Sequence, residues 1–290
     1  MSGVATPAEL AGRLETVGYL TDEALATALF LAVAMAQPIL LEGEPGVGKT
    51  EAAKSLARAL DTELIRLQCY EGLSSADALY EWNYPRQLLG IRLAEARGEK
   101  PSEADLFSED YLLARPLLSA IEYPGPGPAV LLIDEVDRAD DEFEAFLLEL
   151  LAEATVTIPE LGTRRARFRP LTVLTSNRTR ELHDALKRRC LYHWITHPDT
   201  ERVAAIIRLR VPGVADWLAS RVARSVGRLR GLELYKPPGV AEAINWAGAL
   251  HALGVSTLDA DSARLTMSAV LKYEEDRARA EGSLAEVAGE

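Results

Sequence analysis

Residues 43–50 have the types and spacing of a phosphate-binding loop. They read Gly43-Glu44-Pro45-Gly46-Val47-Gly48-Lys49-Thr50 and fit the pattern Gly-x-x-x-x-Gly-Lys-Ser/Thr. Glycines let consecutive backbone N–H groups point into one concavity, and the start of a helix adds partial positive charge. We therefore expect Lys49 to reach the β- and γ-phosphates of a nucleotide and the Thr50 hydroxyl to bind Mg²⁺.

A second group of candidate residues is acidic and follows an apolar run. Val130-Leu-Leu-Ile133 leads directly into Asp134 and Glu135. Carboxylates at the carboxyl end of such a strand lie where ligands bind in open α/β sheets. We expect Asp134 to hold Mg²⁺, mostly through water, and Glu135 to polarise the attacking water as a general base.

Further candidates follow the next apolar run, Leu171–Thr175. Asn177 is placed to position that water beside the γ-phosphate, although Ser-Asn after a strand is also an ordinary turn. Arg188 and Arg189 end a helical segment. Basic residues in a last turn favour the helix dipole, and an arginine there is also suited to stabilising γ-phosphate charge.

A parallel sheet is the element that these residues need. Short apolar or alternating runs are typical of buried strands, and helical spacing between them predicts strand–helix alternation, hence an α/β fold with helices flanking a parallel sheet. The predicted strands are 39–41, 63–68, 129–133, 171–175 and 191–195. One helix is predicted from Thr21 or Asp22 to Ala36, and another from Glu51 to Leu60.

Two insertions and a helical end complete the predicted organisation. Residues 69–121 hold an aromatic-rich insertion, with one helix expected over Leu112–Ile121, and 155–168 a β-hairpin. We place the α/β domain at 1–198 and an all-α lid domain at 199–290. Lid helices are predicted near 199–210, 215–230, 239–252 and 260–275, followed by a frayed polar end, Glu274–Glu290; residues 1–16 read as a polar lead-in.

Composition narrows the class of protein. The net charge of -12 among 290 residues argues against nucleic acid as the default partner. Cys69 and Cys190 are the only cysteines and read as small buried residues, which suits a reducing, cytoplasmic location. The longest apolar stretch, Ala28–Leu41, is interrupted by Gln37-Pro38 and is shorter than a membrane span.

Taken together, the phosphate-binding loop, Asp134-Glu135, Asn177 and Arg188-Arg189, followed by a helical lid, resemble an AAA+ ATPase. The insertion after Gln68 and the hairpin resemble the MoxR family. The segments closest to CoxD-like members of that family are Tyr80-Glu-Trp-Asn-Tyr-Pro85, Ser176–His183 and Lys236-Pro-Pro-Gly239.

The resemblance implies a function and several residue roles. It implies Mg²⁺-dependent ATP hydrolysis in a homo-oligomeric ring, expected to be a hexamer. The ring would mature a molybdenum-containing carbon monoxide dehydrogenase-like client with a von Willebrand factor A partner. Arg189 matches the arginine finger, with Arg188 as second choice, and Tyr19 and Leu20 match a segment that lines the adenine pocket, although a helix-start contact explains them equally well.

Some interpretations stay open at this level. The family's usual lid arginine is missing around Pro238-Gly239-Val240, and Lys236 is a candidate substitute. Gln68 is a candidate for orienting Glu135. The hairpin arginines fit an acidic protein surface better than nucleic acid. A DNA-directed AAA+ motor and a non-hydrolysing ATP-binding scaffold are the alternative functions, and the intact Glu135 argues against the scaffold.

Overall fold

The computed structural model describes residues 3–289, which form two compact units. The larger unit takes in the chain up to Arg13, Asp22–Glu42 and Ala52–Trp194. The second unit takes in Leu14–Thr21, Gly43–Glu51 and the chain from Ile195 onward, so it includes the phosphate-binding loop. Each unit has its own cluster of buried apolar side chains.

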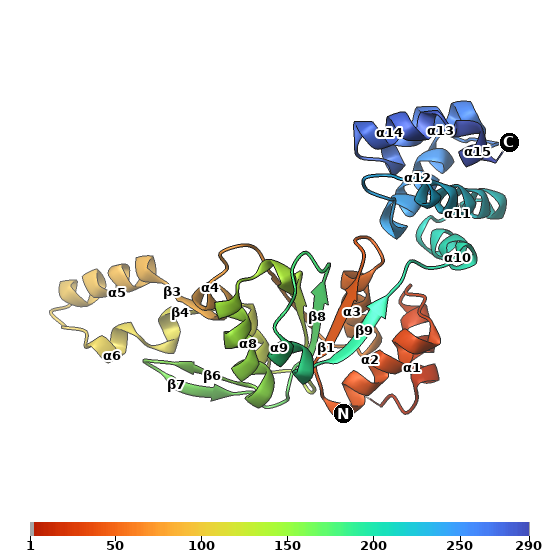
Figure 1. The fold of residues 1–290 in the computed structure, drawn as a ribbon. Helices are drawn as coiled ribbons and strands as arrows, with labels where there is room; N and C mark the ends of the chain where they lie inside the picture. Colours follow the sequence, from red (N-terminus) through yellow and green to blue (C-terminus); the bar gives the residue numbers. More distant parts are fainter. Residues whose placement is uncertain (1–2, 290) are drawn as a thin grey trace. The chain divides into compact units, whose positions relative to one another are not determined.

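A five-stranded sheet organises the larger unit, in the order β2-β5-β8-β1-β9. Figure 1 labels its strands β8, β1 and β9, which lie side by side. The pairs β1–β8, β5–β8 and β2–β5 are parallel, as the apolar runs predict. Every residue of β1, β5 and β8 is buried, which is why these strands read as continuous rather than alternating apolar segments. The strands are β1 (Ile39–Gly43), β2 (Leu64–Gln68), β5 (Val130–Asp134), β8 (Leu171–Ser176) and β9 (Leu191–Ile195).

Helices connect and flank these strands. The Asp22 carboxylate accepts the Leu25 N–H and caps α2, and Ala36 ends that helix in the left-handed region, as expected. The N-terminal lead-in is instead a helix, α1, whose Leu10 and Leu14 are fully buried. The helices are α1 (Pro7–Thr16), α2 (Glu23–Met35), α3 (Lys49–Ala59), α8 (Asp141–Glu153), which follows the short 3-10 turn η2 (Val136–Arg138), and α9 (Asp184–Arg189).

The insertion differs from its prediction at one point. The single helix expected over Leu112–Ile121 is a strand, β4 (Leu112–Ala114), followed by α7 (Pro116–Ile121). Pro116 takes the first helical turn, and the residue before a proline favours an extended backbone, so Arg115 separates the two elements. The other elements are α4 (Ser75–Leu79), β3 (Tyr80–Trp82), which pairs antiparallel with β4, α5 (Tyr84–Ala96), α6 (Glu103–Leu106) and η1 (Glu109–Tyr111).

The predicted hairpin is present, with its second strand earlier than expected. β6 (Thr155–Ile158) pairs antiparallel with β7 (Gly162–Arg165), and Gly162 adopts a φ of 80° at the turn. Arg164 lies 2.6 Å from Glu109 and 3.7 Å from Glu122, so its charge is used inside the unit. The Arg169 guanidinium likewise donates to the Leu151 and Ala152 carbonyls.

The second unit is helical to its end. The polar end Glu274–Glu290 is predicted to be frayed, but α14 and α15 form within it because Ala280, Leu284 and Val287 face the apolar cluster; Glu290 lies outside the described residues. None of the helices within residues 3–289 is long and apolar enough to cross a membrane. The helices are α10 (Thr200–Arg210), α11 (Asp216–Gly231), α12 (Val240–Ala252), α13 (Ala260–Val270), α14 (Glu274–Glu281) and α15 (Leu284–Ala288).

Candidate functional site

The phosphate-binding loop has the backbone that its glycines predict. Gly46 and Gly48 adopt φ angles of 82° and 100°, a region that side chains disfavour, and α3 begins at Lys49. The Lys49 amine is almost fully buried and donates to the Gly43 and Glu44 carbonyls at 2.7 and 2.8 Å. Hydrogen bonds from its own lysine hold the loop together at a helix N-terminus, an arrangement that fits a phosphate group. The Thr50 hydroxyl supplies an oxygen of the kind that Mg²⁺ prefers.

The start of α12 packs directly on this loop within the same unit. The Val240 N–H donates to the Gly46 carbonyl at 3.0 Å. A methyl group added to Gly239 would lie 2.8 Å from the Gly46 Cα, so two glycines allow the helix and the loop to touch. Lys236 lines a hollow of about 120 Å³ beside Pro45 and Gly46, which places this candidate substitute next to the loop.

The residues proposed for the adenine pocket also lie in this unit. The Tyr19 ring is about 4 Å from the position that a Cβ on Gly48 would occupy, so the ring borders the loop. The Leu20 carbonyl accepts from Arg202 at 2.7 Å, which ties this segment to α10. His197 bonds Glu44 of the loop at 2.9 Å, and burial lowers the pKa of His197 more than the Glu44 carboxylate raises it.

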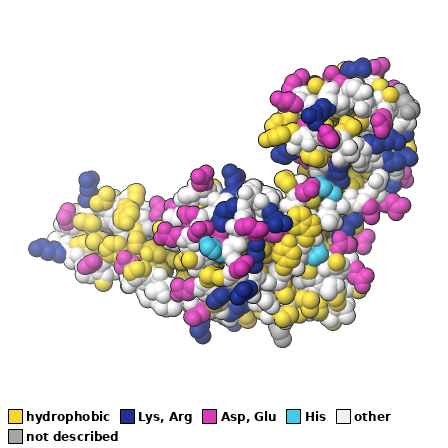
Figure 2. Space-filling view, in the orientation of Figure 1, with side chains coloured by type: hydrophobic (Ala, Val, Ile, Leu, Met, Phe, Trp, Pro, Cys, Tyr) yellow, Lys and Arg dark blue, Asp and Glu magenta, His cyan; other side chains and the backbone are white. Residues whose placement is uncertain are grey.

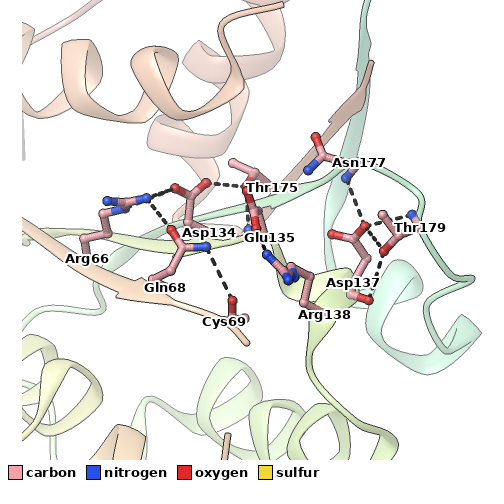
Figure 3. Close-up of polar contacts among 10 residues, drawn as sticks. All are labelled: Arg66, Gln68, Cys69, Asp134, Glu135, Asp137, Arg138, Thr175, Asn177 and Thr179. Carbon is pink, nitrogen blue, oxygen red and sulfur yellow. Dashed lines mark hydrogen bonds and ion pairs between the residues drawn. The ribbon is translucent and has the colours of Figure 1, made fainter. Parts of the chain in front are cut away.

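The acidic residues after β5 are held by their neighbours in the sheet (Figure 3). Asp134 is 2% exposed; its Oδ1 accepts from the Thr175 hydroxyl at 2.6 Å, and its Oδ2 accepts from Arg66 at 2.6 Å. Glu135 adopts a left-handed backbone with a φ of 55°, and its N–H donates to the Thr175 hydroxyl at 2.9 Å. The Glu135 carboxylate lies 3.2 Å from Arg138.

A buried carboxylate, Asp137, connects this turn to the loop that carries Asn177. Its Oδ2 accepts from the Asn177 N–H at 3.2 Å, the Thr179 N–H at 2.8 Å and the Thr179 hydroxyl at 2.7 Å. The same loop is anchored to α8 by an ion pair between Arg180 and the buried Glu144. The backbone of Asn177 is thus tied to the turn that also carries Glu135.

Other candidates lie elsewhere or bond differently. Arg188 and Arg189 are exposed in the last turn of α9, and neither guanidinium is paired with a carboxylate within residues 3–289. Gln68 accepts from Arg66 and donates to the Cys69 carbonyl at 3.4 Å, so its contacts are not with Glu135. Burial, with the nearby carboxylates Asp134, Asp137 and Glu135, raises the pKa of Cys69 to about 12, which suits an inert thiol.

Three residues were missed from the sequence: Arg66, Asp137 and Thr175. Arg66 and Thr175 act across neighbouring strands, and Asp137 acts between the segments that follow β5 and β8; a local pattern does not show which strands will be neighbours. A weak signal was present in Thr175, because a polar residue at the carboxyl end of a buried apolar run points toward the edge where ligands bind.

A glycine-rich loop between β1 and α3, with acidic residues after β5 of a parallel sheet, defines a P-loop nucleotide-binding protein. Residues 38–190 match the family model described as AAA domain (dynein-related subfamily). These residues are more than half of the chain, and the chain belongs to this family. Its fold is therefore the expected P-loop AAA+ fold followed by C-terminal helices.

Individual relatives agree with the fold. Two RuvB variants from Thermotoga maritima have TM-scores of 0.50 and 0.51 with identities of 16% and 18%. The likeness covers 91% and 86% of this chain and 70% of each of theirs, and at such identities it shows the fold alone. The Lon protease of Halothermothrix orenii is 34% identical over 129 residues, which are 42% of this chain and 13% of that protein.

Proposed function

We propose that this AAA+ chain hydrolyses ATP with Mg²⁺. The observation that carries the proposal is the strand order β5-β8-β1. The phosphate-binding loop follows β1, Asp134 ends β5 and Glu135 comes directly after it, and Asn177 follows β8. The carboxyl ends of parallel strands meet at one edge of the sheet, so β1, from which the loop continues, ends at the same edge as β5 and β8.

Each residue then has a distinct task. The loop N–H groups and Lys49 bind the phosphates of ATP. Thr50 and Asp134 would hold Mg²⁺, which would neutralise the negative charge that develops on the phosphate oxygens. Glu135 accepts the proton of the attacking water as general base, and Asn177 orients that water. Tyr19 and Leu20 border the base of the nucleotide.

We further propose a ring, most simply a hexamer, in which Arg189 of one subunit serves the nucleotide of its neighbour. Arg188 is the second choice for this role. The exposure of both arginines, with no carboxylate partner within residues 3–289, supports their availability to another subunit.

The MoxR-type chaperone role is a proposal from sequence resemblance. The chain would act in the cytoplasm with a von Willebrand factor A partner on a molybdenum metalloenzyme client. Its structure weakens the case for a nucleic-acid motor, because Arg164 and Arg169 of the hairpin segment make internal contacts. Acidic and basic side chains are also interspersed over the face in Figure 2.

Two substitutions separate binding from chemistry. Lys49→Ala removes a charged donor to the phosphates and should abolish measurable ATP binding. Glu135→Gln keeps the shape of the side chain but accepts no proton, so ATP should still bind while turnover falls by about 10²- to 10⁴-fold. Calorimetric binding and phosphate release measure the two effects. Unchanged affinity in Lys49→Ala, together with undiminished hydrolysis by Glu135→Gln, would contradict the assignment.

A further inference from the structure

One hydroxyl group joins the two acidic residues of the site. Thr175 is 1% exposed near the end of β8, where it pairs with Leu41 of β1. Its Oγ1 donates to Asp134 Oδ1 at 2.6 Å and accepts from the Glu135 N–H at 2.9 Å. Asp134 is the last residue of β5, and Glu135 is the first residue of the turn that follows. The Thr175 hydroxyl therefore bonds to two consecutive residues, one on each side of the peptide bond that joins them.

The polarity of the two contacts is fixed by their chemistry. An ionised carboxylate only accepts, so the single hydroxyl proton goes to Asp134. The oxygen lone pairs are then available to the Glu135 N–H, and each bond polarises the other in a buried setting. Valine, which has the same shape without the hydroxyl, would leave both groups without this partner.

The backbone of Glu135 shows why this contact is needed. A φ of 55° and ψ of 49° place a non-glycine residue in the left-handed region, which costs free energy and persists only where neighbours hold it. This conformation decides where the Glu135 side chain leaves the chain. Its N–H bond to Thr175 comes from a neighbouring strand, β8, and so fixes the turn against the sheet.

We propose that Thr175 is a positioning residue that sets the direction of Glu135 and holds Asp134 in place. It acts through the Asp134 carboxylate and the Glu135 backbone N–H and does not itself touch the reacting atoms. The inference rests on the proposed ATPase function for its kinetic consequence, whereas its structural consequence, a protected Glu135 amide, stands independently of hydrolysis.

The experiment compares Thr175→Val, which removes the hydroxyl, with Thr175→Ser, which retains it. Thr172→Val is the matched control, because Thr172 is buried on the same strand and, within residues 3–289, its hydroxyl bonds only to the Pro170 carbonyl at 3.4 Å. We expect Thr175→Val to lower kcat by about 10- to 100-fold, the range of one or two lost buried hydrogen bonds. The KM for ATP should stay within about threefold. Thr175→Ser and Thr172→Val should stay near wild-type rates.

Hydrogen exchange of the Glu135 amide supplies the second readout. In the chain of 290 residues, exchange at this amide should accelerate by about tenfold or more in Thr175→Val and remain slow in Thr175→Ser. Slow exchange and a wild-type kcat in a folded Thr175→Val would overturn the inference. If Thr175→Val does not fold, Thr175→Ala takes its place, and the same exchange test decides. If the wild type fails to hydrolyse ATP, the proposed function falls, and the exchange comparison alone supports or rejects the placement.

Discussion

Asp137 shows how one buried side chain organises a loop that sequence motifs only mark. One of its oxygens accepts three hydrogen bonds from Asn177 and Thr179, and the residue is 2% exposed. Three donors converging on one carboxylate fix the backbone of Asn177 more firmly than a turn alone would.

Removing that carboxylate should therefore be costly. We expect Asp137→Ala to lower the free energy of unfolding by about 2–4 kcal/mol, because buried donors lose their acceptor. Asp140→Ala is the control, since Asp140 is exposed and only caps α8 through the Phe143 N–H, a loss of about 1 kcal/mol. Urea denaturation measures both. Equal destabilisation by the two substitutions would show that Asp137 does no more than a helix cap.

At this scale the sequence predicted the chemistry but not its supports. The roles of Lys49, Thr50, Asp134 and Glu135 are predictions from their spacing along the chain, which is itself the signal. Thr175, by contrast, acts on residues about forty positions away, through the β5–β8 pairing. That pairing is a long-range event, which local periodicity does not encode.

Among the elements, the contact between α12 and the phosphate-binding loop depends on the absence of two side chains. Gly239 has an extended backbone that any residue adopts, so its requirement for glycine is steric rather than conformational. A Cβ there would meet the Gly46 Cα at 2.8 Å and the Gly46 oxygen at 3.0 Å. The close approach also permits the Val240 N–H bond to the loop.

Gly239→Ala should push α12 away from the loop. We expect the free energy of unfolding to fall by about 1–3 kcal/mol and ATP affinity to weaken by about threefold or more, as overpacking displaces the loop backbone. Gly248→Ala is the control within the same helix, because a Cβ there meets nothing within 4 Å. That change should stabilise the helix by about 0.5–1 kcal/mol. Thermal unfolding measures the stability of both variants, and nucleotide titration measures their affinity for ATP. Similar stability and affinity in Gly239→Ala and Gly248→Ala would contradict the steric argument.

Elements were predicted well where the pattern was long and unambiguous, and less well at short amphipathic segments. The continuous apolar runs gave the parallel strands β1, β5 and β8. Leu112–Ala114 was taken as helix because three residues are too few to show alternation. The helices α14 and α15 were missed because their few apolar residues are buried only by tertiary packing against α11 and α13.

For the molecule as a whole, the chain divides into two compact units, each with its own apolar core. The phosphate-binding loop groups with the helical unit rather than with the sheet from which it emerges. The place of Arg189 in α9, between β8 and β9, puts it outside the contact network around Asp134 and Asp137. The proposed role of this arginine is to act on the nucleotide of a neighbouring subunit, which would make it a property of the assembly.

Mixed assemblies test that property directly. Arg189→Ala subunits keep a working phosphate-binding loop, and Lys49→Ala subunits keep a working arginine. Each variant alone should be nearly inactive, with a loss of about 10³-fold or more for the arginine. Mixed rings place an intact arginine against an intact loop at some interfaces, so part of the activity should return. An arginine that acts within its own subunit predicts no recovery, because no subunit carries both groups.

Phosphate release by the mixtures, with subunit exchange verified by native mass measurement, distinguishes an arginine that acts on a neighbour from one that acts within its own subunit. Exchange without any recovery would remove Arg189 from its proposed role, and Arg188→Ala in the same mixture would then test the second choice.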